Sequence, residues 1–265
     1  RDVYKRQEGG NKVSVDERMV HDIVQKVMAN MQISGSVSGM HGVFKDMNDA
    51  INASIEAQKK VCTMTLDQRE QIISLIRKKT HENAEILANM GVNETGMGNV
   101  GDKILKHHLT ADKVPGTEDI STIAWSGDRG LTLVEMGPFG VIGAITPATN
   151  PSETVICNCI GMLAGGNTVV FNPHPNAKKT TIYTINMINE ASIEAGGPDN
   201  IAVTVEAPTL DTSAIMMKHP SIHLLVATGG PGVVTAVLSS GKRAIGAGAG
   251  LSLIHISEPT RLALI

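Results

Sequence analysis

The strongest indication of the fold comes from residues Gly137–Lys179, whose sequence is GPFGVIGAITPATNPSETVICNCIGMLAGGNTVVFNPHPNAKK. The stretch reads as a strand, a tight polar turn and a helix, and this order then repeats. The apolar run Val141–Ile145 is short and partly β-branched, as expected for a strand buried on both faces of a parallel sheet. Two prolines in the following turn prevent regular strand pairing, so the strand ends in a rigid polar loop. The pattern predicts a parallel α/β unit.

Two polar turns follow neighbouring strands of this unit. The first is Thr146-Pro147-Ala148-Thr149-Asn150-Pro151, and the second, Pro173-His174-Pro175, follows the predicted strand Thr168–Asn172. Ligands of open α/β sheets bind at the carboxyl ends of the strands. We therefore expect the two turns to contribute to one site.

Strands and helices continue to alternate towards the carboxyl end. Regular alternation predicts a doubly wound parallel sheet with right-handed crossovers, which places the chain in the α/β class. No GxGxxG motif follows the first strand, so the standard dinucleotide fingerprint is absent. The candidate strands are Val141–Thr146, Thr168–Asn172, Ile201–Val205, His223–Ala227 and Arg243–Ala247, and the candidate helices are about Glu153–Leu163, Asn176–Ala195, Leu210–Lys218 and Gly232–Ser239.

A glycine-rich turn, Thr228-Gly229-Gly230-Pro231-Gly232, joins the fourth of these strands to a helix. The glycines allow a ligand to approach the backbone closely. Free N–H groups and the positive end of the helix dipole favour an anion at such a place. By itself the Gly-Gly-x-Gly pattern is equally typical of a tight turn.

The residues before the sheet fall into four parts. Ser14–Gln32 has apolar residues at helical spacing on one face, and the Gly/Ser-rich segment Ile33–Gly42 that follows is typical of a flexible linker. A helix tethered in this way needs a partner for its apolar face.

Asp46 is expected to cap a helix over Met47–Cys62, and a second helix is expected over Leu66–Met90. Ser121–Met136 reads as a β-hairpin that turns at Asp128-Arg129-Gly130.

Composition narrows the function classes. The 265 residues carry a formal net charge of −3 and only 2% aromatic residues, so nucleic acid is not expected as a partner. The three cysteines form neither a disulfide framework nor a zinc pattern, which indicates a reducing cytosol and no metal site. No apolar run approaches the roughly 20 residues that span a bilayer, so no membrane partner is expected.

At these motifs the chain resembles the CoA-acylating aldehyde dehydrogenases of ethanolamine- and propanediol-utilisation microcompartments. The resemblance runs from about Val15 to Gly250 and covers the amino-terminal half of such an enzyme. It rests on Asn93–Gly98, the TPATNP and NPHP turns, Thr228–Gly230 and Gly246–Gly250. It implies oxidation of a short aldehyde, acetaldehyde or propionaldehyde, with NAD and coenzyme A to give acyl-CoA and NADH through a cysteine thioester. The chain length of the aldehyde stays open.

The resemblance also implies site residues. Asn150 is the expected oxyanion-hole donor, with Thr149 as the alternative because the alignment is ambiguous by one residue. Asn172 stands where ordinary aldehyde dehydrogenases carry a ribose-contacting lysine, which favours NAD over NADP. Ala247 stands where hydrolytic relatives carry a water-activating glutamate, which favours transfer of the acyl group to coenzyme A. The expected cofactor-binding residues are Thr146, Pro147, Asn172, His174, Thr228, Gly229, Gly230 and Gly232.

The nucleophilic cysteine of the family would lie beyond Gly250. Cys62, Cys157 and Cys159 are interpreted as small apolar residues, so the chain is expected to be inactive by itself and to stop before the catalytic domain. Arg1–Gln7 and Leu251–Ile265 match nothing in the family pattern and are interpreted as cloning or sequencing read-through, or else as a divergent tail.

The predicted fold is thus an aldehyde-dehydrogenase-like, Rossmann-type sheet with a helical layer and an oligomerisation hairpin. The resemblance implies two partners, a second copy of the chain and a microcompartment shell protein, inside the cytoplasm. The shell protein would bind the helix over residues 14–32. Alternatively, this helix packs on the surface of its own enzyme. The other functional alternatives are the acylating half of a bifunctional aldehyde–alcohol dehydrogenase and a non-catalytic nucleotide- or shell-binding module. The predicted divisions are 1–13, 14–32, 33–42, 43–120 (helical layer), 121–137 (hairpin), 138–250 (NAD/CoA-binding α/β domain) and 251–265.

Overall fold

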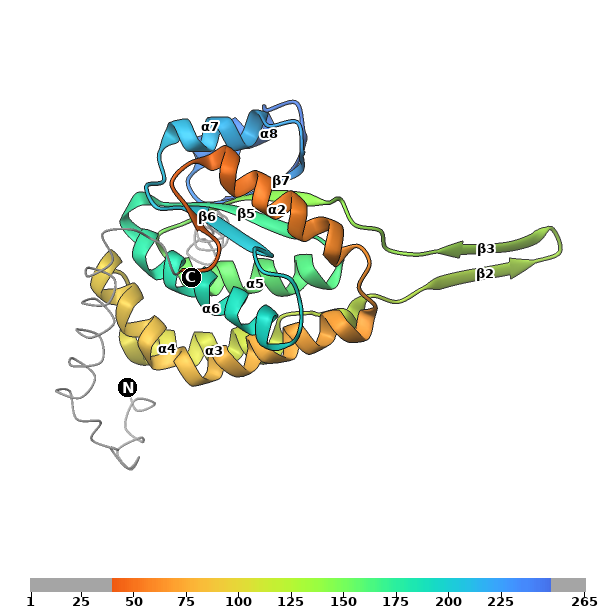
Figure 1. Ribbon diagram of the computed structural model, residues 1–265, viewed down its shortest axis with the longest axis horizontal. Coiled ribbons are helices and arrows are strands. Elements are labelled where there is room, and N and C mark those ends of the chain that lie inside the picture. The colour runs from red at the N-terminus through yellow and green to blue at the C-terminus, as the bar shows by residue number, and fades with distance from the viewer. Residues whose placement is uncertain (1–39, 249–265) are drawn as a thin grey trace, which may run out of the picture. The chain divides into compact units, whose positions relative to one another are not determined.

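The computed structural model describes residues 40–248 (Figure 1). The predictions made for residues 1–13, for the helix over 14–32, for most of the linker over 33–42 and for the tail over 251–265 lie outside the described residues.

A six-stranded sheet forms the centre of the described part, with the strand order β1-β6-β5-β4-β7-β8 and parallel pairing throughout. This confirms the predicted α/β class. The chain lays β5 and β6 on one side of β4 and then returns to lay β7 and β8 on the other side (Figure 1). In open α/β sheets a ligand crevice forms where the strand order reverses in this way, here beside β4. The strands are β1 (Val43–Phe44), β4 (Val141–Thr146), β5 (Thr168–Pro173), β6 (Ala202–Val205), β7 (Ile222–Thr228) and β8 (Arg243–Ala247).

Helices cover both faces of the sheet, and each face has its own apolar core. One core joins α3, α5 and α6 to Ala144, Val169 and Phe171. The other joins α2, α7 and α8 to Val170 and Val203. Val169 and Val170 belong to opposite cores because successive side chains of a strand point to opposite faces. The helices are α2 (Met47–Val61), α3 (Leu66–Thr95), α4 (Val100–Lys113), α5 (Pro151–Ala164), α6 (Lys178–Glu194), α7 (Leu210–Lys218) and α8 (Pro231–Leu238).

The helices predicted over residues 43–120 as a helical layer are divided between these two faces. Met47, Ala50 and Ile51 of α2 pack into the core that contains α7, whereas α3 packs on the opposite face. Helical spacing indicates which side of a helix is apolar, but it does not indicate which face of the sheet that side meets.

Strand β1 is only two residues long and is not among the strands expected from the sequence. It pairs with β6, with Val43 opposite Thr204 and Phe44 opposite Val205. Gly42, which precedes it, has φ +76°, and a Cβ atom there would lie 2.4 Å from the carbonyl oxygen of Ala202. Glycine is therefore required for the chain to enter the sheet at this point.

Local signals account for the helix ends. The side chain of Asp46 accepts hydrogen bonds from the backbone at the start of α2, as predicted. Thr65 and Gln68 form a capping box at the start of α3. That helix runs five residues beyond the predicted end and stops at Gly96, which takes the left-handed conformation with φ +67°.

The hairpin of β2 (Ile123–Gly127) and β3 (Gly130–Val134) extends away from the sheet and its helices (Figure 1). All ten strand residues are exposed, and several of them are large and apolar. Among residues 40–248, no helix combines the length and apolar character needed to span a membrane.

Candidate functional site

A cavity of about 1100 Å³ opens at the carboxyl ends of β4, β5 and β7, where the strand order reverses. Helices α7 and α8 supply the rest of its wall. All candidate oxyanion-hole and cofactor-binding residues from the sequence analysis line this one cavity, whereas Ala247 does not. The cavity brings together three turns that are spread over residues 146–232. The candidate residues in its lining are Thr146, Pro147, Thr149, Asn150, Asn172, His174, Thr228, Gly229, Gly230 and Gly232.

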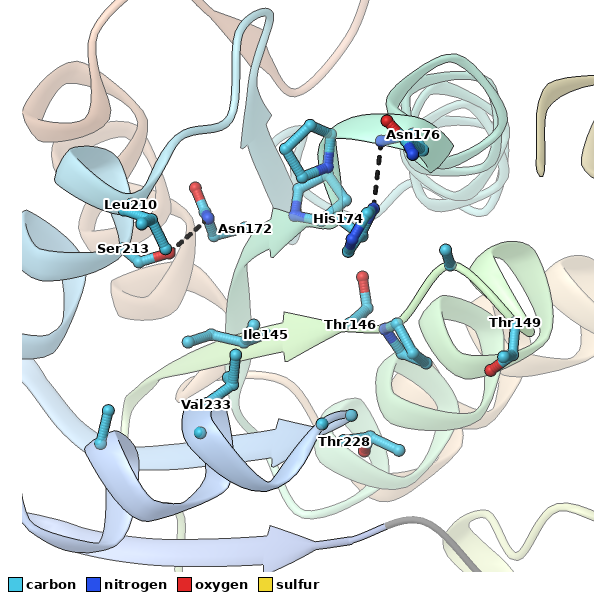
Figure 2. A pocket seen from close by; sticks show the side chains of 18 of the residues that line it. Ile145, Thr146, Thr149, Asn172, His174, Asn176, Leu210, Ser213, Thr228 and Val233 are labelled. Carbon is cyan, nitrogen blue, oxygen red and sulfur yellow. Dashed lines mark hydrogen bonds between the residues drawn. The ribbon is translucent and has the colours of Figure 1, made fainter.

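Thr146 ends β4 at the floor of the cavity. The residue is only 2% exposed, and its Oγ1 atom has no hydrogen-bond partner in the part of the chain that the structure describes. In Figure 2 the hydroxyl points towards the His174 ring, and the His174 N–H donates to the Thr146 carbonyl oxygen at 3.1 Å. Because a buried polar atom without a partner costs free energy, this hydroxyl is suited to bind a polar ligand group.

Asn150 is the residue before helix α5, yet its side chain does not cap that helix. Its Oδ1 atom instead accepts a hydrogen bond from Lys106 Nζ at 3.4 Å. The Asn150 Nδ2 group makes no hydrogen bond with any of residues 40–248 and is a donor at the cavity edge. The carbonyl oxygen of Thr149, the alternative candidate, accepts from Lys103 Nζ at 2.9 Å. The side-chain amide that the oxyanion-hole prediction requires is therefore present and uncommitted.

Asn172 lines the cavity, but its side chain is already occupied. The Nδ2 atom donates to Ser213 Oγ at 2.6 Å and to the Thr209 carbonyl oxygen at 3.3 Å, and Oδ1 accepts from Thr212 Oγ1 at 2.7 Å. Figure 2 shows the bond to Ser213. These bonds fix the start of α7 against the end of β5, so Asn172 shapes the wall and offers a ligand no free amide group.

His174 projects from the turn after β5 and is exposed. Its Nδ1 atom accepts a hydrogen bond from the Asn176 N–H at 3.2 Å (Figure 2). In the neutral ring the proton then resides on Nε2, which is left as a donor for a ligand.

The glycine turn after β7 leads directly into α8, with Gly230 as its N-cap and no side chain capping the helix. A Cβ atom at Gly229, Gly230 or Gly232 would meet nothing within 4 Å. The backbone of Gly230, with φ −67°, also suits any residue. The ligand-free fold therefore has no steric need for glycine at 230, whereas a ligand that approaches the helix start closely would need it.

Among residues 40–248, no aspartate, glutamate, lysine or arginine lines the cavity. An anion bound here would be held by backbone N–H groups, hydroxyls and His174. Of the helices α7 and α8, only the start of α8 was expected at the site from the sequence, and α7 was not. A capping pattern at Thr209 marks the start of α7. The first residue of this helix, Leu210, is 84% exposed. The apolar lining side chains that were not expected from the sequence are Ile145, Leu210, Met217, Val233 and Ala236.

None of the three cysteines lines the cavity. Burial raises the pKa of the Cys157 thiol, and it raises the pKa of the fully buried Cys159 thiol further. Both are therefore held in the thiol form, which is a poor nucleophile.

Comparison with known proteins agrees with this geometry. Residues 20–249 match the sequence model of the aldehyde dehydrogenase family. Over 257 residues the chain is 44% identical to an acetaldehyde dehydrogenase (acetylating) of Bilophila wadsworthia, covering 93% of this chain and 53% of that protein. These figures fit the resemblance inferred from the motifs.

Two solved structures are similar as well. A propionaldehyde dehydrogenase from the Clostridium phytofermentans fucose utilisation bacterial microcompartment is 73% identical with a TM-score of 0.78, over 79% of this chain and 48% of that one. A Rhodopseudomonas palustris propionaldehyde dehydrogenase with bound propionyl-CoA is 50% identical with a TM-score of 0.77, over 78% and 46% of the two chains. The chain thus spans about half the length of the relatives it matches.

Proposed function

This chain belongs to the aldehyde dehydrogenase family, and we propose that the protein containing it is a CoA-acylating member. Its reaction converts a short aldehyde, coenzyme A and NAD into an acyl-CoA, NADH and a proton. The observation that carries the proposal is the convergence of the TPATNP, NPHP and glycine turns on one cavity. Support also comes from its similarity to an acetylating acetaldehyde dehydrogenase and to propionaldehyde dehydrogenases.

NAD and coenzyme A share an adenosine diphosphate portion, and the cavity has groups that fit it. The uncapped start of α8 is suited to the pyrophosphate, and Gly229 and Gly230 allow it to approach the backbone. The unpartnered Thr146 hydroxyl and His174 Nε2 are donors for ribose or phosphate oxygens. The apolar wall from α7 and α8 suits the adenine ring. When bound, NAD accepts the hydride and coenzyme A supplies the thiol that takes the acyl group.

Asn150 is proposed to donate its Nδ2 hydrogens to the aldehyde oxygen as that oxygen gains negative charge. Loss of a single donor of this kind typically costs about 10²–10³-fold in rate. Thr149 is the alternative source of the donor. At the end of β8, Ala247 has no carboxylate to activate water, which supports transfer of the acyl group to coenzyme A.

The test is NADH formation by the natural protein that contains this chain. With acetaldehyde or propionaldehyde we expect NADH to appear only when coenzyme A is present, together with a stoichiometric amount of acyl-CoA. A protein that forms NADH equally fast without coenzyme A would be a hydrolytic enzyme. A protein that binds NAD or coenzyme A but forms no NADH would favour the non-catalytic alternative. Comparing kcat/KM for the two aldehydes identifies the preferred chain length.

The hairpin of β2 and β3 is proposed to bind a second copy of this protein. Its exposed apolar side chains include Ile123, Trp125, Leu131 and Leu133, and two isolated strands are marginally stable in water. Trp125→Lys combined with Leu133→Lys is expected to shift sedimentation towards the monomer. An unchanged sedimentation coefficient would contradict this role.

Residues 14–32 are proposed to bind a microcompartment shell protein through their apolar face, which would place the enzyme inside the compartment. This proposal rests on the amphipathic pattern and on the microcompartment origin stated for the Clostridium phytofermentans relative. Deleting residues 1–35 should abolish co-purification with the shell protein. Persistent co-purification would exclude this segment as the binding element.

A further inference from the structure

Helix α4 carries two polar side chains that are buried against its neighbours. Lys103 is 3% exposed and His107 is fully buried. The helix lies outside the cavity, since none of its residues lines that space. A buried ammonium group is destabilising unless it is paired and fully hydrogen-bonded. The partners of these two residues therefore indicate what α4 holds in place.

His107 Nδ1 lies 2.7 Å from the Lys103 carbonyl oxygen within α4, and the other partners belong to the TPATNP turn and to the first residues of α5. Lys103 Nζ donates to the Thr149 carbonyl oxygen at 2.9 Å and lies 3.3 Å from Glu153 Oε1. His107 Nε2 lies 2.7 Å from Ser152 Oγ, and Ser152 Oγ lies 3.2 Å from Glu153 Oε2. Four side chains thus form one buried network that ends at the turn.

The side chain of Lys103 is enclosed, because the residue is only 3% exposed. A Cβ atom built at Gly91 would lie 3.8 Å from Lys103 Cδ, and one built at Gly98 would lie 3.4 Å from Lys103 Cε. The methylene chain of the lysine therefore runs past two glycines, at a distance where an added methyl group would be in ordinary van der Waals contact with it. With the stem confined, the hydrogen bond to Thr149 holds a defined geometry.

This bond has a consequence for the next residue. The peptide group between Thr149 and Asn150 is planar and trans, so its C=O and N–H point in opposite directions. With its oxygen held by Lys103, the Asn150 N–H points away from that ammonium. Lys106, one turn further along α4, orients the Asn150 side chain by donating to its Oδ1 atom at 3.4 Å. The two hydrogens on Nδ2 then point away from Lys106.

We propose that Lys103 and Lys106 are positioning residues that orient the hydrogen-bond donors of Asn150 at the edge of the cavity. Lys103 fixes the peptide group and Lys106 fixes which way the side-chain amide faces. The role rests on the proposed function, in which Asn150 binds the oxygen that gains charge. Neither lysine lines the cavity, so neither is expected to contribute to cofactor binding.

The kinetic test uses the natural protein that contains this chain. Lys103→Met and Lys106→Met are each expected to lower kcat by about 10- to 100-fold, because small misplacements of catalytic groups have effects of this size. The KM values for NAD and coenzyme A should stay within twofold of the parent values. If Lys103→Met does not fold, Lys103→Met combined with Glu153→Leu removes the whole ion pair and tests the same bond.

Lys242→Met is the matched control. Lys242 is also a partly buried lysine that donates to backbone carbonyl oxygens, those of His219 and Ile222, but it lies outside the cavity lining. Its replacement is expected to lower Tm while leaving kcat unchanged. If Lys103→Met and Lys106→Met behave like this control, the two lysines are only structural and the positioning role is wrong.

Hydrogen exchange of the 265-residue chain supplies a readout that is independent of activity. Amides in the peptide spanning residues 146–154 should exchange faster in Lys103→Met than in Lys242→Met. Equal exchange in the two variants would contradict the positioning role. A parent protein that forms no NADH with coenzyme A present would instead contradict the proposed function, so the two failures are distinguishable.

Discussion

The side-chain nitrogen of Asn172 donates to Ser213 Oγ at 2.6 Å, which ties the end of β5 to the first turn of α7. Asn172 stands in a turn whose resemblance to the family suggested contact with a cofactor ribose. Its bonds instead give it a structural task at the cavity wall. Because α7 supplies Leu210 and Met217 to that wall, the shape of the site depends on this link.

Replacement of Asn172 should therefore destabilise the fold. Asn172→Leu leaves Ser213 and the Thr209 carbonyl oxygen without this partner, and we expect a loss of about 1–3 kcal/mol in the free energy of unfolding. Urea unfolding measures it. Asn176→Leu is the control, since Asn176 lines the same cavity with an exposed side chain. Equal stability of the two variants would contradict the structural role.

Gly42 offers a test of how the chain enters the sheet. Gly42→Ala combines a positive φ with an overlap, because the new Cβ would lie 2.3 Å from Asn189 Nδ2. Gly196→Ala has the same φ of +76° but meets nothing within 4 Å. We expect Gly196→Ala to cost about 1–2 kcal/mol for the backbone conformation alone. Gly42→Ala should cost roughly a further 1–3 kcal/mol for the overlap. Equal losses in chemical denaturation would show that the close approach is absent.

His107 should make the stability depend on pH. Burial is the largest influence on His107 and lowers its pKa from the usual 6.5. The Glu153 carboxylate and the hydrogen bond to the Lys103 carbonyl act to raise this pKa, and the Lys103 ammonium and His108 lower it by smaller amounts. Between the folded-state pKa and pH 6.5 the unfolded chain binds a proton at this residue and the folded chain does not. The stability due to His107 is thus present above pH 6.5 and is lost as the pH falls towards the folded-state pKa.

His107→Gln should accordingly flatten the decrease in Tm between pH 7.5 and pH 5.5. Part of the slope should remain, because burial and Lys242 also lower the pKa of His219. An undiminished slope in His107→Gln would mean that another group causes the pH dependence.

The sheet and the main turns could be predicted from the sequence because their signals are local. Apolar runs, prolines and glycines identify β4, β5 and the turns after them within a few residues. The rule that ligands bind at the carboxyl ends of parallel strands then places Thr146, His174 and Gly230 at one site before any coordinates are known. The shared cavity lining agrees with that reasoning.

The remaining features depend on contacts between distant parts of the chain. Lys103 reads as a surface residue of a helix, and only its bond to Thr149, 46 residues away, explains its burial. The two-residue strand β1 gives no periodic signal and exists only through its pairing with β6. Asn172 is a polar residue in an expected site, and nothing local shows that α7 occupies its side chain.

The start of α8 in this cavity is proposed to bind the pyrophosphate of NAD and coenzyme A. The most direct measurement is calorimetric titration of the 265-residue chain with each cofactor, for the parent and for Gly230→Val. A Cβ at Gly230 meets nothing in the fold, so the variant should keep the Tm of the parent. We predict that the parent binds both cofactors and that Gly230→Val loses at least tenfold in affinity for each. Equal affinity of parent and variant, or no binding by the parent, would contradict the account.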